Sequence, residues 1–391
     1  MTDVPYPVPD DGGSRPVYLD YNATTPVDPE VAAAMLPWLG ERFGNPSSVH
    51  FYGREARKKV EESREEVAAL IGAEPDEIVF AGSATEANHL AILGAARALE
   101  GSGRSILVAS AVEHPSVTGP FDLLAPDGWK VRLLPVDSSG RVDLRAAERL
   151  IGPETAFVSV MLANNETGTI QPVREISDFA RSRGALIHVD AAQAAGKISV
   201  GVGALGADFL TLAGHKFYAP KGIGVLYVRR GTPLRPLMAG GGQERGLRPG
   251  TENVPAIAGV GMAARLIRNN LGREVRRMER LRERLYRRLA GAIPEIVLNG
   301  SSDDRLPNTL NLSFPGVRGG DLLEETPWVC ASTGSACHGT TPLPSPVLRA
   351  MGFPDERTLG AIRLSLGRFT TPDEIDRASV ALVDSWRRLV S

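Results

Sequence analysis

The residue whose surroundings say most about chemistry is Lys216, near the end of the segment LAGHKF at residues 212–217. A lysine amine becomes a nucleophile near neutral pH only when desolvation or a neighbouring cation lowers its pKa. The apolar run at residues 208–213 would bury the approach to Lys216 and provide that desolvation. Such an amine could form a Schiff base with a carbonyl compound. The alternative is a solvated or ion-paired lysine at a strand end, because lysine is seldom buried.

A second chemical group, Asp190, ends the short apolar run ALIHVD at residues 185–190. This run predicts a buried parallel strand that delivers Asp190 to the carboxyl edge of a sheet, where open α/β sheets bind ligands. A carboxylate there could keep a pyridine nitrogen protonated, as pyridoxal phosphate requires of its protein. Capping of a following helix is the alternative role for Asp190, but it would leave Lys216 unexplained.

Two segments could bind the phosphate of such a cofactor. At residues 80–86 (FAGSATE) a predicted strand passes through a turn of small residues into a helix. The backbone N–H groups and the Thr85 hydroxyl at that helix start could bind an anion, although the same residues suit an ordinary capped helix. The glycine-rich loop at residues 240–251, which ends at Thr251, could lie against a phosphate or form a flexible surface turn.

Three further polar residues follow or flank predicted strands. His114 could stack its imidazole on a pyridine face, and Asn165, in the segment NNETG, could meet a carboxylate or a phenolic oxygen. Gln193 lies three residues after Asp190, roughly one helical turn on, and could reach the oxygen beside the Schiff base. Each also has an ordinary structural alternative, since histidines and turn amides are common outside active sites.

The chain has only two cysteines, which are too few for a disulfide framework. Cys337 lies among small and flexible residues, and an exposed thiol there could carry a group away from a site. Cys330 has a more apolar setting, from which we expect a buried structural residue.

Length and charge limit the classes of protein to which the chain can belong. A chain of 391 residues suggests two domains, and a formal net charge of −2 does not favour binding to nucleic acid or an acidic membrane surface. Residues 1–15 lack the apolar core of a signal peptide, and no later run approaches twenty apolar residues. We therefore expect a cytoplasmic protein with no membrane or direct nucleic-acid contact, and no metal site is predicted.

Apolar strands alternate with helical stretches along most of the chain, which predicts a parallel sheet with helices on both faces. The predicted strands are residues 77–80, 105–109, 130–134, 156–161, 186–190, 208–212 and 224–228, and the predicted crossover helices are residues 85–100, 143–151 and 172–183. An amphipathic, arginine-rich helix is predicted from about residue 253 to residue 289, broken near Asn270. It would link the sheet domain to a second domain.

Taken together, the motifs resemble those of the cysteine desulfurases, which belong with the class V aminotransferase-like enzymes of fold type I. The resemblance covers residues 18–371 and rests on YLDYNATTP (18–26), NNETG (164–168), VDAAQ (189–193), GHK (214–216), RPGT (248–251) and GSAC (334–337). It implies an α/β fold with a large domain at 26–264, built on a mostly parallel seven-stranded sheet that binds pyridoxal 5'-phosphate. Residues 1–25 and 265–391 would form a smaller α/β domain that carries the Cys337 loop.

The resemblance also implies a role for each matching residue. Lys216 would form the Schiff base and later move the Cα proton, while Asp190 would pair with the pyridine nitrogen. Gln193 would meet the phenolic oxygen, and His114 would stack on the ring. The phosphate would be bound by Ala84, Thr85 and His215, and by Thr251 from the neighbouring subunit of a homodimer. The substrate carboxylate would be bound by Asn22, Asn165 and Arg363.

The implied reaction converts L-cysteine to L-alanine and leaves a persulfide on Cys337. A protein acceptor, such as an iron–sulfur scaffold or a thiolation enzyme, would then receive the sulfur. Two other functions stay open from the sequence: a selenocysteine lyase, which shares nearly all these motifs, and a catalytically silent scaffold for a sulfur-accepting partner. Three positions depart from the usual pattern without removing a catalytic group: Ser83, His89 and Ala213, of which Ala213 would remove one hydrogen bond to the phosphate.

Overall fold

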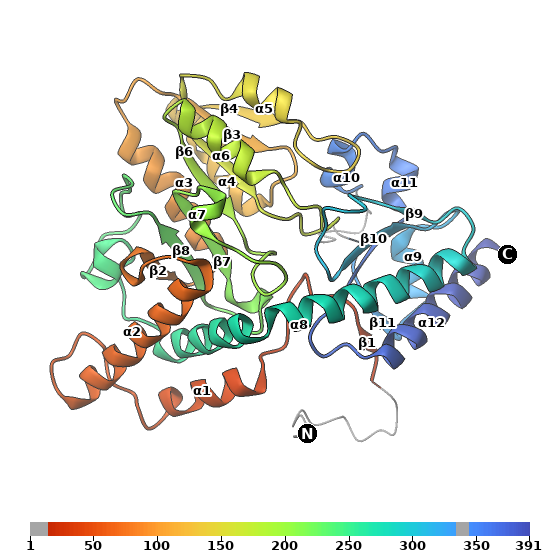
Figure 1. The fold of residues 1–391 in the computed structure, drawn as a ribbon, viewed down its shortest axis with the longest axis horizontal. Helices are drawn as coiled ribbons and strands as arrows, with labels where there is room; N and C mark the ends of the chain where they lie inside the picture. Colours follow the sequence, from red (N-terminus) through yellow and green to blue (C-terminus); the bar gives the residue numbers. More distant parts are fainter. Residues whose placement is uncertain (1–14, 334–343) are drawn as a thin grey trace.

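A seven-stranded sheet forms the centre of the larger part of the molecule (Figure 1). The computed structural model describes residues 15–333 and 344–391. In sheet order the strands are β2 (Ile78–Ala81), β8 (Gly224–Val228), β7 (Phe209–Ala213), β6 (Leu186–Asp190), β5 (Thr155–Met161), β3 (Ile106–Ser110) and β4 (Lys130–Leu134). Strand β8 runs antiparallel to both of its neighbours, and the pairs from β7 to β4 are parallel. The predicted mostly parallel α/β sheet is confirmed.

Helices cover both faces of this sheet, because successive side chains of each strand point to opposite faces. In β3, Val108 packs into one hydrophobic core, while Leu107 and Ala109 pack into the other. The helices around the sheet are α1 (Pro29–Leu39), α2 (Phe51–Ile71), α3 (Ala84–Leu99), α4 (Pro115–Leu124), α5 (Leu144–Leu150), α6 (Val173–Ser182) and α7 (Val202–Leu205). Residues of α3 and α4 contribute to the second core, and residues of α2 and α6 contribute to the first.

The long helix α8 (Val254–Ala292) is continuous, so the predicted break near Asn270 is wrong. The Asn270 amide donates to the carbonyl of Leu266 one turn earlier, at 2.9 Å, and its oxygen accepts from Arg273 at 3.1 Å. These bonds keep the polar side chain on its own helix instead of ending it. The first half of α8 packs in the core of the large sheet, and the part near Leu285 packs in a separate core.

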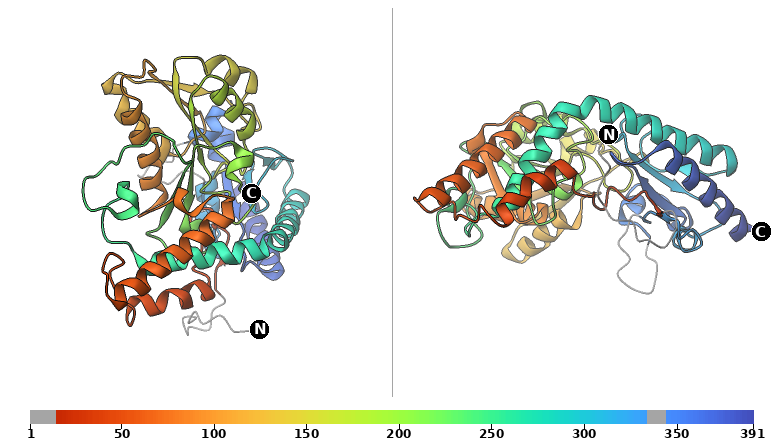
Figure 2. Two further views of the ribbon diagram at one scale, coloured as in Figure 1. Left: turned by 60° about the vertical axis from the view of Figure 1, so that its left-hand side comes forward. Right: turned by 90° about the horizontal axis from the view of Figure 1, so that it is seen from below.

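That separate core belongs to a smaller α/β unit at the right of Figure 1. It contains the antiparallel sheet β12 (Ala361–Ser365), β10 (Thr309–Ser313) and β9 (Val297–Leu298), and the parallel pair β1 (Val17–Tyr18) and β11 (Val329–Cys330). Its helices are α9 (Gly319–Glu324), α10 (Pro346–Ala350), α11 (Asp355–Leu359) and α12 (Pro372–Val390). Figure 2 shows α8 running along both units, with α12 beside its second half. The domain boundary at residue 264 remains our proposal.

The described residues contain neither a membrane-spanning helix nor a cluster of metal-binding side chains. No helix among them is both long and apolar enough to span a membrane. Within the same ranges, His, Cys, Asp and Glu side chains form no group of three or more that could hold a metal ion.

Candidate active site

Lys216 lies directly after the end of β7, in a single 3₁₀ turn that spans Gly214–Lys216. Its Nζ donates to the carbonyl oxygen of Asn22 at 2.6 Å and to that of Ala23 at 2.7 Å. Burial, and secondly the positive charge of Arg363, lower the pKa of Lys216 to about 8. The amine is therefore poised to lose its proton close to neutral pH, as the sequence predicted.

The chain is held tightly on both sides of this lysine. A Cβ on Gly214 would lie 2.6 Å from the Cγ2 of Ile223, so only glycine fits there. Two residues after Lys216, Tyr218 has a φ of +70°, which is rare for a bulky side chain. Its N–H donates to the hydroxyl of Thr25 at 2.9 Å, and its own hydroxyl accepts from the N–H of Arg368 at 2.6 Å. These contacts fix the turn that presents the amine.

Asp190 ends β6, the strand beside β7, so its carboxylate reaches the same edge of the sheet as Lys216. One carboxylate oxygen accepts from the Asn88 amide at 3.0 Å, and the other accepts from the N–H of Ala192 at 2.9 Å. A turn, not an α-helix, follows Asp190, so the helix-capping alternative is wrong. The expectation that Gln193 lies one helical turn further on fails for the same reason.

Gln193 nevertheless points into this cluster and is almost fully buried. Its Nε2 donates to the Asn22 carbonyl at 2.9 Å, which is the same oxygen that accepts from Lys216. Its Oε1 accepts from the Nζ of Lys197 at 2.7 Å. Side chains from the turns that follow β6 and β7 therefore converge on one backbone carbonyl of the N-terminal segment.

His114 is the N-cap of α4 and connects to the same cluster through polar side chains. Its Nδ1 accepts from the Ser116 N–H at 3.1 Å and lies 2.9 Å from the Ser116 hydroxyl. That hydroxyl accepts from Asn88 at 2.9 Å, and Asn88 also donates to Asp190. Burial lowers the pKa of His114, partly offset by Asp190, so the ring is neutral near pH 7.

The predicted phosphate cradle lies at the start of α3, where Ser83 is the N-cap. The amide N–H groups of Ala84 and Thr85 have no hydrogen-bond partner within the described part of the chain. A Cβ on Gly224 would lie 2.2 Å from the carbonyl carbon of Ser83, so glycine on β8 allows the turn to approach the sheet. An anion could therefore bind to a well-supported set of backbone donors.

His215 and Thr251 are the other two predicted phosphate-binding residues. The Nδ1 of His215 lies 3.1 Å from the Thr24 hydroxyl, and burial with nearby lysines lowers its pKa to about 4. Thr251 is exposed at the end of its loop. A buried ion pair anchors this loop, since both Nη atoms of Arg64 donate to the Glu244 carboxylate at 2.8 Å.

Arg363, in the middle of β12, brings a guanidinium to the cluster from the smaller unit. Its Nη2 donates to Asp20 at 2.7 Å and its Nη1 to the Asn165 carbonyl at 3.1 Å, while its buried Nε has no partner within the described residues. The Asn22 amide donates to Asn165 and Thr309. A substrate carboxylate could therefore accept a hydrogen bond from the unpartnered Nε of Arg363. To accept one from the Asn22 amide as well, it would have to displace Asn165 or Thr309 from that amide.

Of the two cysteines, one can be compared with its sequence-based prediction. Cys337 lies outside the described residues. Cys330 is exposed, so the expectation of a buried structural thiol is wrong. The reason is the alternation of side chains along β11, which turns Val329 into a core and Cys330 to the surface.

Sequence reasoning missed two buried ionisable residues beside the cluster, Lys197 and Glu113. Glu113 accepts from the Ser110 hydroxyl and from the N–H of Met161, and burial raises its pKa to about 8. A signal existed for Lys197, which lies four residues after Gln193 in a segment of small residues. None existed for Glu113, because an acidic residue next to His114 suits a surface turn equally well.

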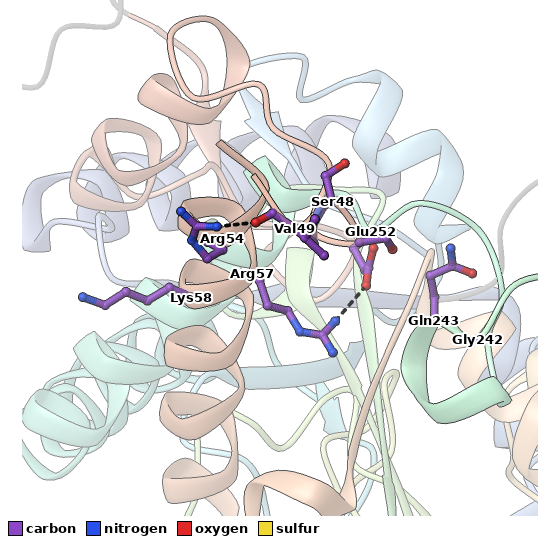
Figure 3. A pocket seen from close by; sticks show the side chains of 10 residues that line it. Ser48, Val49, Arg54, Arg57, Lys58, Gly242, Gln243 and Glu252 are labelled. Atoms are coloured by element: carbon purple, nitrogen blue, oxygen red, sulfur yellow. Dashed lines mark hydrogen bonds and ion pairs between the residues drawn. The ribbon is translucent and has the colours of Figure 1, made fainter. Parts of the chain in front are cut away.

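A hollow of about 650 Å³ lies elsewhere, between the start of α2 and the 242–252 loop. Figure 3 shows Arg54, Arg57 and Lys58 on one side of it and Gln243 on the other. Arg57 reaches the Glu252 carboxylate at 3.5 Å. This hollow shares no lining residue with the cluster around Lys216.

Comparison with known proteins identifies the group to which this arrangement belongs. The family model described as aminotransferase class-V matches residues 17–378. The chain belongs to the class-V aminotransferase family. A cysteine desulfurase of a Nostoc species is 45% identical over 375 residues, which is 95% of this chain and 93% of that protein.

Solved structures agree with the sequence match to this family. A NifS-like protein superposes with a TM-score of 0.90 at 38% identity, covering 96% of this chain and 100% of its own. A structure described as SspA in complex with cysteine has a TM-score of 0.80 at 34% identity, covering 90% and 99%.

Class-V aminotransferases use pyridoxal phosphate, and the residues present fit that cofactor. The free N–H groups at the start of α3 suit its phosphate, and the carboxylate of Asp190 suits its pyridine nitrogen. The low pKa of Lys216 suits attack on its carbonyl carbon. The cofactor prediction is confirmed by the family, and the individual residue roles remain proposals.

Proposed function

We infer that this chain is a cysteine desulfurase, which takes the sulfur from L-cysteine and releases L-alanine. The observation that carries this conclusion is the convergence of Lys216, Asp190 and Gln193 at one sheet edge, in a chain so similar to a cysteine desulfurase along nearly its whole length. When bound, the cofactor withdraws electrons from the substrate's α-carbon and stabilises negative charge there.

Lys216 has two tasks in this proposal. Its unprotonated amine attaches the cofactor, and once the substrate has displaced it, the free amine moves the proton at the α-carbon. Both tasks need the neutral amine, which burial and Arg363 supply by lowering the pKa to about 8. The carbonyls of Asn22 and Ala23 hold the Nζ in place.

Asp190, Gln193 and His114 orient the ring. The two hydrogen bonds that Asp190 accepts from Asn88 and Ala192 fix its carboxylate for the pyridine nitrogen. Gln193 would direct the N–H that is not bound to the Asn22 carbonyl toward the phenolic oxygen, and His114 would stack on the ring face. Phosphate binding falls to Ala84, Thr85 and His215, with Thr251 from a neighbouring subunit.

Arg363 binds the substrate carboxylate, supported by Asn165 and Asn22. Its buried Nε lacks a partner in the described part of the molecule, and a carboxylate that satisfied this donor would remove the cost of leaving it unpaired. The ion pair with Asp20 holds the guanidinium in the site before substrate arrives.

Cys337 receives the sulfur. Its thiolate attacks the substrate sulfur, a sulfur–sulfur bond forms and the carbon–sulfur bond breaks. The electron pair of the broken bond stays with the substrate, which takes up protons and leaves as alanine. The persulfide then passes its outer sulfur to a protein acceptor such as an iron–sulfur scaffold or a thiolation enzyme. A reducing compartment such as the cytoplasm would keep this thiol available.

We also propose a homodimer, in which each Thr251 reaches the phosphate site of the other subunit. Two features support a dimer interface near Thr251. Thr251 is exposed and directly precedes Glu252, which lines the hollow between α2 and the 242–252 loop. Large apolar side chains are also exposed on α1, on the start of α2 and between them: Leu36, Leu39, Phe43, Val49, Phe51 and Tyr52.

The test is release of alanine and sulfide from L-cysteine by the purified protein with a reductant, with L-selenocysteine measured in parallel. Turnover of L-cysteine is the expected result. Turnover of selenocysteine alone would make the protein a selenocysteine lyase, and no turnover of either amino acid by protein with bound cofactor would leave only a scaffold role.

A further inference from the structure

Lys197 is a buried lysine that the proposed function does not use. Its side chain is 5% exposed, and it follows Gly196, whose φ of +77° turns the chain inward. A Cβ on Gly196 would lie 3.1 Å from the Cβ of Phe217, so the turn packs against the residue next to Lys216. The chain therefore delivers Lys197 into the interior beside the active site.

No carboxylate lies within ion-pair distance of Lys197 among the described residues. The charged groups that act on it are Lys216 and Arg363, both cationic, and together with burial they place its pKa well below the usual value. The positive charge of Lys197 in turn contributes to lowering the pKa of His215. An uncompensated buried charge is costly, which disfavours the protonated form of this amine, and its Nζ acts as a hydrogen-bond donor.

The acceptor for that donor is the Oε1 of Gln193, at 2.7 Å. The side-chain amide of Gln193 could exchange the positions of its oxygen and nitrogen, but each of these atoms faces a group that fits only one of the two arrangements. Its Nε2 meets the Asn22 carbonyl at 2.9 Å, which cannot donate, and its Oε1 meets the Lys197 Nζ. Without Lys197, the Oε1 would be buried with no donor, and the side chain would lose its fixed position.

We propose that Lys197 is a positioning residue, which fixes the amide of Gln193 so that the N–H not bound to the Asn22 carbonyl faces the phenolic oxygen of the cofactor. The inference rests on the proposed role of Gln193. It extends to Lys216, because the Asn22 carbonyl accepts from both Gln193 and Lys216. Lys197 thus orders the donor that tunes the cofactor and the carbonyl that holds the reactive amine.

The test uses the protein with bound cofactor and no substrate, and it records the pH at which the visible absorption band changes. Lys197→Met removes the donor and keeps the length of the side chain. We expect the midpoint to rise by about one pH unit, which is a tenfold change in proton affinity, because a donor to the phenolate oxygen favours its unprotonated form. Cofactor should also dissociate more readily in dialysis. Lys130→Met, on an exposed edge strand, is the matched control and should match the parent protein.

Two further variants separate a donor from a charge or a packing role. Lys197→Gln retains an uncharged donor and should bring the midpoint back toward that of the parent protein. In the background of Gln193→Leu, Lys197→Met should cause no additional shift, because the two residues act as one unit. If Lys197→Met does not yield folded protein, as judged by thermal unfolding without cofactor, Lys197→Leu removes the same donor with a smaller side chain.

An unchanged midpoint in Lys197→Met would overturn the proposal. So would a Lys197→Gln variant that behaves like Lys197→Met, or shifts from Lys197 and Gln193 that simply add. None of these readouts requires turnover. Normal alanine release without a shift would therefore refute only this inference, and a shift without alanine release would refute only the proposed function.

Discussion

At the scale of single residues, the active site depends on burial and a neighbouring cation that lower the pKa of a lysine amine. Lys216 has no carboxylate partner within ion-pair distance in the described residues, and Arg363 acts on it from the neighbouring unit. The same guanidinium is proposed to bind the substrate carboxylate. One arginine therefore connects substrate binding to the reactivity of the amine.

Replacing Arg363 tests this connection through pH dependence. In cofactor-free protein, incorporation of pyridoxal phosphate should speed up as pH rises through about 8, because only the neutral amine of Lys216 attacks. Arg363→Gln removes a cation that disfavours the protonated amine, so the pKa of Lys216 and the midpoint should rise, by about half to one pH unit. Rates of incorporation measured across pH give the midpoint, with the exposed Arg149→Gln as control. A midpoint that stays or falls would contradict this account.

Individual residues also show where sequence reasoning succeeds. Lys216 and Asp190 were predictable because Asp190 ends a buried apolar strand and Lys216 lies in the turn directly after the neighbouring one, and parallel strands bring such ends to one edge. Lys197 was harder to predict, because its spacing of four residues from Gln193 among small residues does not by itself distinguish a lysine that enters the interior from one that reaches solvent. Cys330 was misjudged because its burial depends on which face of a two-residue strand meets a core.

At the scale of elements, α8 is the feature that joins the two halves of the site. Its first part packs on α2, and Gly261 allows the close approach, since a Cβ there would lie 2.6 Å from the Cβ of Ser63. The predicted break near Asn270 relied on local preference. Packing at both ends and the return bond from Asn270 to Leu266 outweigh that preference.

Two glycine substitutions on α8 should therefore have opposite effects on stability. Gly261→Ala places a methyl group against Ser63 and should destabilise the protein by about 1–3 kcal/mol through overpacking. Gly272→Ala lies on the exposed side of the same helix, where the nearest atom is 3.7 Å away, and should stabilise by about 0.5–1 kcal/mol. Thermal unfolding of the cofactor-free variants measures both. Equal effects of the two substitutions would show that α2 and α8 do not pack as closely as described.

At the scale of the whole molecule, the alternation of strands and helices was sufficient to predict the large sheet and its parallel pairs, but not the antiparallel direction of β8. It did not predict how the smaller unit reaches the site, because Asp20 and Arg363 are 343 positions apart and meet only through tertiary packing. The exposed apolar side chains around the start of α2 likewise gain meaning only from the three-dimensional surface.

The proposed homodimer can be tested at the exposed apolar side chains around the start of α2. Light scattering after gel filtration should give twice the chain mass of 41.7 kDa. Phe51→Glu places a charge in the exposed apolar patch and should shift the protein toward monomer and weaken cofactor retention, because Thr251 then no longer reaches its partner. Leu133→Glu, exposed on the edge strand β4, should leave the dimer intact. A monomeric parent protein that retains cofactor would contradict the shared phosphate site.

The central claim is that L-cysteine sulfur is transferred to Cys337, and mass spectrometry of the protein after brief exposure to L-cysteine tests it most directly. The account predicts one added sulfur atom on Cys337, none on the exposed Cys330 when the peptide is fragmented between them, and alanine in equal amount. Cys337→Ala should keep the cofactor absorption and lose the added sulfur. Sulfur on Cys330, or undiminished sulfide release by Cys337→Ala, would contradict the account.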